Sequence, residues 1–215
     1  MKNLILTLLV AGGVLSASPV STTTTANVEL TTPGDPTNVV LGNDYVSPYT
    51  MLINGHSYAA MCIDFFDESY LNQPWNAYIT PVSGNLSNTY LGNSGATQYK
   101  EAAYLYEQMV GLNPNAPGYG STRTDIQEAV WAITNSAYTP SVDVSKVDNW
   151  MTLAAEDYSS MNLSGFEIVS DVNQCPGRNQ EFIVATPEPA SLMLMGAGLL
   201  LAGFGAIRRK LKATA

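Results

Sequence analysis

Two apolar runs flank an Asn-Gly pair in residues 49–63, which read YTMLINGHSYAAMCI. Asn54 and Gly55 both tolerate the positive φ angles of a two-residue type I′ turn, and such a pair between apolar segments is the strongest short hairpin signal. The pattern therefore predicts two antiparallel strands, Tyr49–Ile53 and His56–Ile63, joined by a tight turn.

Three amphipathic segments follow the hairpin. Apolar residues recur at spacings of three and four over Tyr99–Val110, Thr124–Ser136 and Ser145–Tyr158, which is the period of a helix with one buried face. Thr124 is a suitable N-cap for the second helix. We therefore expect Gln127 close to the start of that helix.

Short strands are predicted on both sides of the helical region. Asn38–Leu41 and Thr80–Val82 precede it, and Gly165–Val169 and Glu181–Ala185 follow it and can pair with each other. Strands at both ends of a helical middle define an α+β fold. We expect an N-terminal β-hairpin and small sheet packed on three helices, late C-terminal strands, and then one transmembrane helix.

The C-terminal residues have three successive parts. A short motif of Pro187, Glu188 and Pro189 precedes Ala190–Ile207, which holds no charged residue. As a helix, these eighteen residues would span about 27 Å, close to the roughly 30 Å core of a bilayer. A basic stop follows, and it should remain on the cytoplasmic side. It contains Arg208, Arg209 and Lys210.

This order of motif, apolar span and basic stop resembles the PEP-CTERM sorting tail of exported bacterial proteins. The resemblance implies recognition by a membrane-bound processing enzyme of the exosortase type. It also implies transit through the inner membrane and a final location at the cell surface or outside the cell. A plain C-terminal membrane anchor is the alternative interpretation of the same residues.

The N-terminal residues have the layout of a secretory signal peptide. Lys2 precedes the apolar stretch Leu4–Leu15, and small residues follow. The cleavage site stays open, and a cut after Ala26 is one alternative. We therefore assign residues 1–26 to a signal peptide and linker, 27–185 to one exported domain, and 186–215 to the sorting tail.

The exported region is strongly acidic. Up to Pro187 it contains seventeen acidic residues against four basic ones, a net charge of −13. Such a surface disfavours nucleic acid and anionic lipid as partners. It suits an extracellular protein that meets polysaccharide or cations.

Few residues are candidates for catalysis. His56 is the one histidine and follows a turn, so no zinc site of the usual kind can form with two cysteines. Asp64, Asp67 and Glu68 form an acidic cluster, but without the glycine and glutamate spacing of an EF-hand loop. We expect no enzymatic activity, cofactor or metal, with an exported hydrolase as a remote alternative.

Two short sequences stand out together. Cys62 lies in Met61–Asp64, and Gln127 lies in Asp125–Trp131. The pair resembles the thioester domains of bacterial surface adhesins. That resemblance implies an internal thioester between the Cys62 sulfur and the Gln127 side-chain carbonyl, open to attack by surface amines. The alternative function is therefore a covalent adhesin.

The same region also resembles an uncharacterised group of PEP-CTERM proteins, over about Ser47–Ser136. The shared segments are Pro-Tyr-Thr at 48–50, Asn-Gly at 54–55, Cys-x-Asp-Phe at 62–65, Trp-x-Ala at 75–77 and Gln-x-Ala-x-Trp at 127–131. The leading expectation is a non-enzymatic exported protein of the cell surface or extracellular matrix, sorted through its C-terminal tail.

Cys175 offers Cys62 a competing partner. Exported chains with two cysteines usually pair them, and a Cys62–Cys175 disulfide would contribute about 5 kcal/mol on the chain-entropy model. One sulfur cannot make both bonds. The thioester, the disulfide and two free thiols therefore stay open as alternatives.

Overall fold

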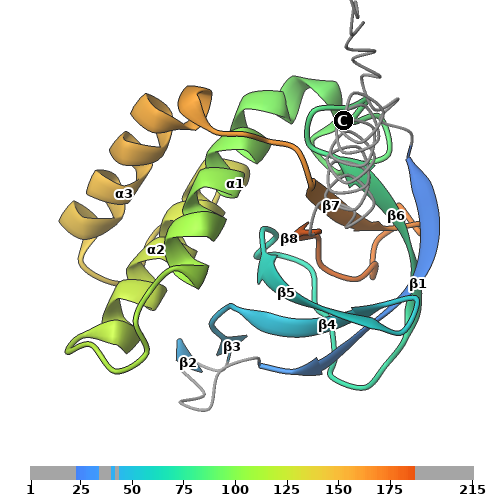
Figure 1. Cartoon of the computed structure of the whole chain (residues 1–215), viewed down its shortest axis with the longest axis horizontal. Helices are drawn as coiled ribbons and strands as arrows, with labels where there is room; N and C mark the ends of the chain where they lie inside the picture. The colour runs from blue at the N-terminus through green and yellow to red at the C-terminus, as the bar shows by residue number, and fades with distance from the viewer. Residues whose placement is uncertain (1–22, 34–39, 42–43, 187–215) are drawn as a thin grey trace, which may run out of the picture.

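The computed structural model describes residues 23–33, 40–41 and 44–186. A β-barrel lies on one side of the molecule and three helices lie on the other (Figure 1). The helices are α1 (Ala96–Val110), α2 (Tyr119–Thr134) and α3 (Val144–Asp157), with short 3₁₀ turns η1 (Gly92–Gly95) and η2 (Tyr158–Ser160). The sequence-based expectation of an α+β domain with three helices is confirmed.

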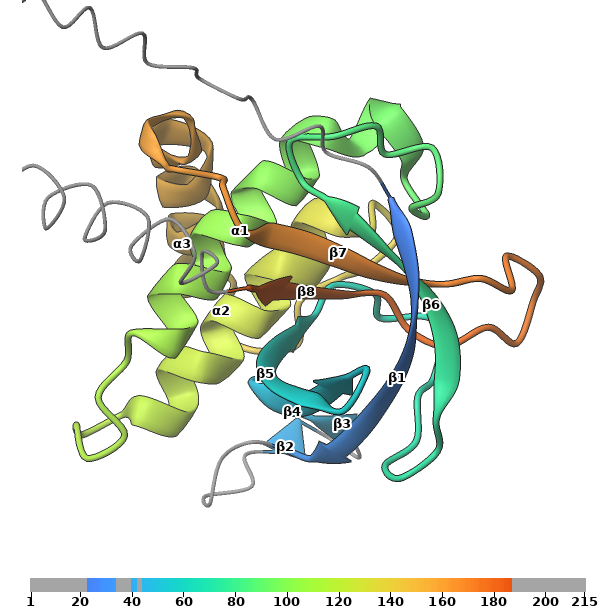
Figure 2. The same ribbon diagram turned by 45° about the vertical axis from the view of Figure 1, so that its right-hand side comes forward.

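The barrel closes six strands in the order β1-β4-β5-β8-β7-β6. They are β1 (Thr24–Thr32), β4 (Tyr49–Ile53), β5 (His56–Cys62), β6 (Trp75–Pro81), β7 (Phe166–Asp171) and β8 (Phe182–Ala185). A separate two-stranded sheet pairs β2 (Val40–Leu41) with β3 (Asp44–Tyr45). Figure 2 shows β8 beside both β5 and β7.

The predicted hairpin is confirmed. Asn54 and Gly55 have φ angles of 49° and 82°, and Ile53 pairs with His56 across the turn. The late strands also pair with each other, as expected, with Ile168 opposite Ile183. Cys62 is the last residue of β5.

The expected small sheet is instead a closed barrel, because the sequence analysis missed β1. This strand pairs with β4 along one edge and with β6 along the other. It begins at Thr24, three residues before the predicted domain start, and Ala26 is already buried within it. Thr24–Ala26, which we had assigned to the linker, therefore belong to the barrel.

Helix α2 starts five residues earlier than predicted. Gly118 precedes it in the left-handed conformation, with φ 78°, which glycine adopts without steric cost. Thr124 is not the N-cap, since its hydroxyl donates to the Gly120 carbonyl inside the helix. Gln127 consequently lies about two turns into α2 rather than at its start.

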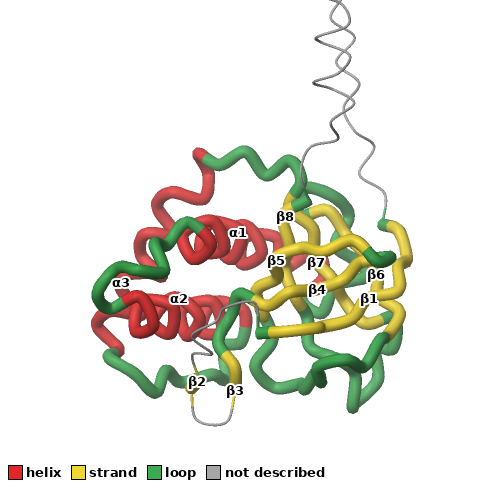
Figure 3. Tube along the Cα trace, turned by 60° about the horizontal axis from the view of Figure 1, so that its bottom comes forward, coloured by secondary structure: helices red, strands yellow, loops and turns green. Residues whose placement is uncertain are grey.

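The core has two parts that meet at β5. Ala60 and Cys62 face the barrel interior, whereas Met61 and Ile63 pack against the helices. This alternation follows from the period-two geometry of a strand. Trp131 of α2 packs with the barrel cluster rather than with the helices. Figure 3 shows α1 and α2 running side by side next to the strands.

No helix within residues 23–33, 40–41 and 44–186 is long and apolar enough to cross a membrane. The predicted transmembrane span, Ala190–Ile207, and the signal-like stretch, Leu4–Leu15, lie outside the described residues. The expected transmembrane helix therefore stays a prediction.

Candidate functional site

Cys62 lies at the end of a barrel strand with its side chain almost fully enclosed. The residue is 1% exposed, and its thiol is free. The Sγ–H donates to the Asp64 carbonyl at 3.0 Å. The strand thus presents a sequestered thiol where the barrel meets α2.

Gln127 reaches Cys62 from α2 and is fully buried. Its Nε2 donates to the Cys62 carbonyl oxygen at 2.8 Å. Because Sγ is four covalent bonds from that oxygen, the sulfur lies within about 8 Å of the amide nitrogen. The structure therefore brings the two predicted thioester residues together.

A second side chain of α2 fixes the helix against the same strand end. The Thr134 hydroxyl donates to the Ile63 carbonyl at 2.7 Å. Gln127 and Thr134, seven residues apart, thus bind two consecutive carbonyls at the end of β5. Two such bonds define the position of Gln127 along the strand.

Ser47 connects the two partners, and sequence reasoning missed it. Its N–H donates to Gln127 Oε1 at 3.3 Å, and its hydroxyl oxygen accepts from the Cys62 N–H at 2.9 Å. Its carbonyl accepts from Arg123 Nε at 2.8 Å. The sequence did hold a signal for Arg123. It is one of four basic residues in an acidic domain, and it lies four residues before Gln127, on the same helix face.

The Cys62 thiol is protonated at neutral pH. Burial raises its pKa to about 12, and a backbone interaction with Asp64 that favours the thiolate opposes that shift only in part. The N-terminus of α2 does not offset this rise, because the helix begins at Tyr119, about two turns before Gln127. Such a thiol is unreactive toward solutes and protected from oxidation.

The Trp131 indole lies next to this thiol. Its N–H favours the Cys62 thiolate and so also opposes the rise in pKa. It does not reach hydrogen-bonding geometry with the sulfur, since Nε1 is buried without a partner among the described residues. An unmatched buried donor is therefore adjacent to the candidate sulfur.

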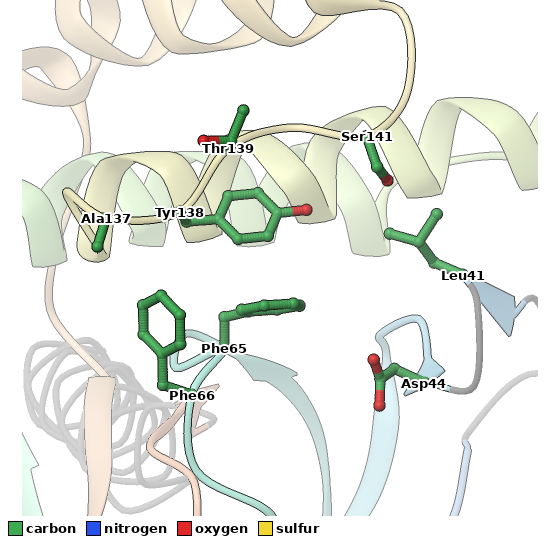
Figure 4. A pocket seen from close by; sticks show the side chains of 8 residues that line it. All are labelled: Leu41, Asp44, Phe65, Phe66, Ala137, Tyr138, Thr139 and Ser141. Carbon is green, nitrogen blue, oxygen red and sulfur yellow. The ribbon is translucent and has the colours of Figure 1, made fainter.

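An aromatic cluster covers Trp131. The Phe65 ring centroid lies 4.9 Å from that of Trp131 and 4.5 Å from that of Tyr138. Figure 4 shows Phe65 and Phe66 pointing toward Tyr138 from the opposite side of a pocket of about 400 Å³. Trp131, whose indole lies beside Cys62, is thus packed against aromatic rings and is 2% exposed.

An adjoining cavity of about 860 Å³ reaches the same aromatic residues. Tyr49, Phe65 and Trp131 contribute to its lining, together with acidic residues. The acidic residues that line it are Asp44, Asp67 and Glu68. The cavity gives a solute a route toward the residues that cover Cys62.

The acidic cluster does not form a uniformly solvated rim. Asp64 is buried, which raises its pKa to about 6. Asp67 instead pairs with Arg178 at 2.7 Å. Among the described residues, no group of three or more His, Cys, Asp or Glu side chains is placed to hold a metal. His56 is exposed on the hairpin.

The structure does not join the two cysteines. Cys175 is exposed after β7, and its N–H donates to Asn173 Oδ1. Cys62 is buried in the barrel interior. The disulfide stays a prediction that a redox measurement decides.

Comparison with known proteins gives one motif and one structural neighbour. A family model described as the PEP-CTERM protein-sorting motif matches residues 185–210. The chain thus carries this motif, which is associated with exosortase processing and with a cell-surface or extracellular location. No curated protein matches the chain.

The structural neighbour is the N-terminal thioester domain of a surface protein from Clostridium perfringens. The match has a TM-score of 0.41 and 12% identity, and it covers 76% of this chain and 99% of that one.

Proposed function

We propose that this chain is a non-enzymatic, exported protein of the cell surface or extracellular matrix whose reactive group is a Cys62–Gln127 thioester. The observation that carries the proposal is the buried Gln127 amide in contact with Cys62. The contact is with the Cys62 main-chain carbonyl and leaves the thiol within about 8 Å of the carboxamide, both away from water. A carboxamide and a thiol are the two reactants that an internal thioester requires.

Thioester formation balances without an external reagent. The Cys62 sulfur attacks Gln127 Cδ, the C–N bond breaks, and the thiol proton leaves with the nitrogen as ammonia. An amine then attacks the same carbon, forms an amide, and returns the proton to the Cys62 sulfur. Each molecule reacts once, so the protein is consumed as a linker and is not a catalyst.

Mass spectrometry of the intact exported protein tests this proposal. We expect a mass lower than the sequence by one ammonia, and methylamine should add at Gln127 and release the thiol. Gln127→Ala should abolish both effects. Gln98→Ala, which removes a half-buried glutamine of α1, is the matched control and should leave both unchanged.

Two other results would contradict the proposal. A mass lower by two hydrogens, with a peptide linking Cys62 to Cys175, would indicate the disulfide instead. An unmodified mass together with no methylamine uptake would leave two free thiols. Either result would support a surface protein with a structural domain and no covalent chemistry.

Processing of the two ends belongs to the same proposal. We expect the mature protein to lack Met1–Leu15 and Ala190–Ala215, and signal cleavage to fall before Thr24, where the barrel begins. Terminal peptide mapping of surface material measures this. Recovery of the segment 208–212 on the exported product would indicate a retained anchor.

A further inference from the structure

We propose that the Ser47 N–H is the oxyanion donor of this thioester and that Arg123 is the positioning residue that holds and polarises it. The inference rests on the proposed function, since it assigns parts to the same site. It concerns the two residues that connect Cys62 to Gln127 and that no sequence motif had indicated.

The first step concerns the acyl oxygen. Gln127 Oε1 becomes the carbonyl oxygen of the thioester, and the Ser47 N–H already donates to it at 3.3 Å. Negative charge collects on this oxygen in the tetrahedral intermediates of both formation and aminolysis. A donor fixed there beforehand stabilises that charge without reorganisation, which is the principle of an oxyanion hole.

The second step concerns what fixes the donor. Arg123 Nη2 donates to the carbonyls of Val46 and Ser47, each at 2.6 Å, and Nε also donates to Ser47. The planar guanidinium fork can hold two adjacent carbonyls at once. Arg123 is fully buried, so these bonds are not weakened by competition with water.

The third step concerns the strength of the donor. The Val46 carbonyl and the Ser47 N–H belong to one peptide group. A cationic donor on that carbonyl draws electron density from the nitrogen, so the Ser47 N–H becomes a stronger donor. Arg123 therefore acts on Gln127 through a single peptide unit, although the two side chains also share a face of α2.

Ser47 also constrains the nucleophile. Its hydroxyl oxygen accepts from the Cys62 N–H at 2.9 Å. One residue thus contacts the acyl oxygen through its N–H and the cysteine backbone through its side chain. This arrangement fixes the Cys62 main chain relative to the Gln127 side chain.

The test compares Arg123→Met and Arg123→Lys with Arg178→Met in the exported protein. Arg178→Met makes the same substitution at a partly exposed arginine that pairs with Asp67 and does not touch Ser47. Two properties are measured, the rate of methylamine aminolysis and the infrared carbonyl stretch of the thioester, with ¹³C at the glutamine Cδ. A merely structural role for Arg123 would not move the stretching frequency.

We expect Arg123→Met to slow aminolysis about 10-fold or more, since loss of one oxyanion donor costs about 10²- to 10³-fold. Its carbonyl stretch should move to higher frequency because the hydrogen bond to the acyl oxygen weakens. Arg123→Lys keeps the charge but not the fork and should be intermediate. Arg178→Met should match the wild type in both measurements.

The outcomes separate this inference from the proposed function. Absence of the one-ammonia deficit in the wild type overturns both. A thioester whose rate and frequency stay at wild-type values in the Arg123 variants overturns only the roles of Ser47 and Arg123. If Arg123→Met fails to fold, the test uses Arg123→Lys alone. An aminolysis rate and a carbonyl frequency equal to those of the wild type would then contradict the inference.

Discussion

Two buried polar networks join the barrel to the rest of the domain, and they differ in how fully their groups are paired. Glu181, just before β8, is 2% exposed. Its Oε1 accepts from the Tyr90 N–H at 2.9 Å and from the Ser170 hydroxyl, and its Oε2 accepts from the Tyr99 hydroxyl at 2.6 Å. The second network is that of Cys62 and Gln127.

The Glu181 carboxyl is surrounded by donors from β7, α1 and the loop before η1. These bonds link three elements of the fold through one carboxyl group. The Gln127 amide has one acceptor and one donor, and its acceptor is the main-chain carbonyl of the residue that bears the thiol. A carboxylate paired with a full set of donors stabilises the fold, whereas a carboxamide held against a cysteine residue supplies the groups of the proposed thioester.

Removal of Glu181 should cause the largest loss of stability. Glu181→Ala leaves two buried donors and one part-buried donor without an acceptor, and each such buried group costs about 1–3 kcal/mol. We expect the free energy of unfolding to fall by about 4 kcal/mol in urea denaturation. Glu156→Ala, at an exposed position of α3, is the control and should change it by less than about 0.5 kcal/mol. If Glu181→Ala lowers the free energy of unfolding no more than the control does, the Glu181 hydrogen bonds do not stabilise the fold.

The same carboxyl should make stability depend on pH. Burial raises the pKa of Glu181 to about 7 from an ordinary value of 4.5. The folded state therefore binds a proton that the unfolded state has lost, so stability falls as pH rises from about 4.5 through about 7. The Glu181 carboxyl alone should lower the free energy of unfolding by about 3 kcal/mol over this interval.

Urea denaturation at pH 4.5 and pH 8 measures this change. Glu181→Gln should remove most of it, and Asp64, whose pKa burial raises to about 6, should account for a smaller remainder of the same sign. A wild-type stability that rises over this interval would contradict the assignment.

The local parts of the fold could be predicted from the sequence because their signals are local. Asn54-Gly55 determines the hairpin, and apolar periodicity gives the three helices. The closure of the barrel could not be predicted, since β1 pairs with β6 across about fifty residues and its start, Thr24–Ala26, has the composition of a linker. Pairing between distant strands leaves no periodic signal in either one.

The candidate site could likewise be predicted only in part from the sequence. Cys62 and Gln127 could be proposed from their short motifs, and their contact follows from a hairpin packed on a helix. Each hydrogen bond named above for Ser47 and Arg123 involves a main-chain N–H or carbonyl on one side, and a main-chain partner leaves little trace in the sequence. The predicted position of Gln127 at the start of its helix was wrong because the start of α2 depends on the left-handed Gly118 rather than on the suitable cap Thr124.

Substitution of Cys62 should change stability only slightly, although it should abolish the thioester chemistry. Compared with wild-type protein whose thioester has been opened by methylamine, so that neither protein holds the cross-link, Cys62→Ala removes one buried sulfur atom and should lower the free energy of unfolding by about 1 kcal/mol. The same substitution should abolish the one-ammonia deficit and methylamine uptake completely. Urea denaturation and intact-mass measurement on one preparation give both values.

Cys175→Ala is the matched control for this last prediction. Because Cys175 is exposed, the substitution should change stability by less than about 0.5 kcal/mol and leave amine uptake intact. A disulfide predicts the opposite pattern, since losing either cysteine would then cost about 2–5 kcal/mol under oxidising conditions and almost nothing after reduction. If the two variants lose equal stability, and if reduction removes the difference from wild type, Cys62 has a structural role like that of Glu181.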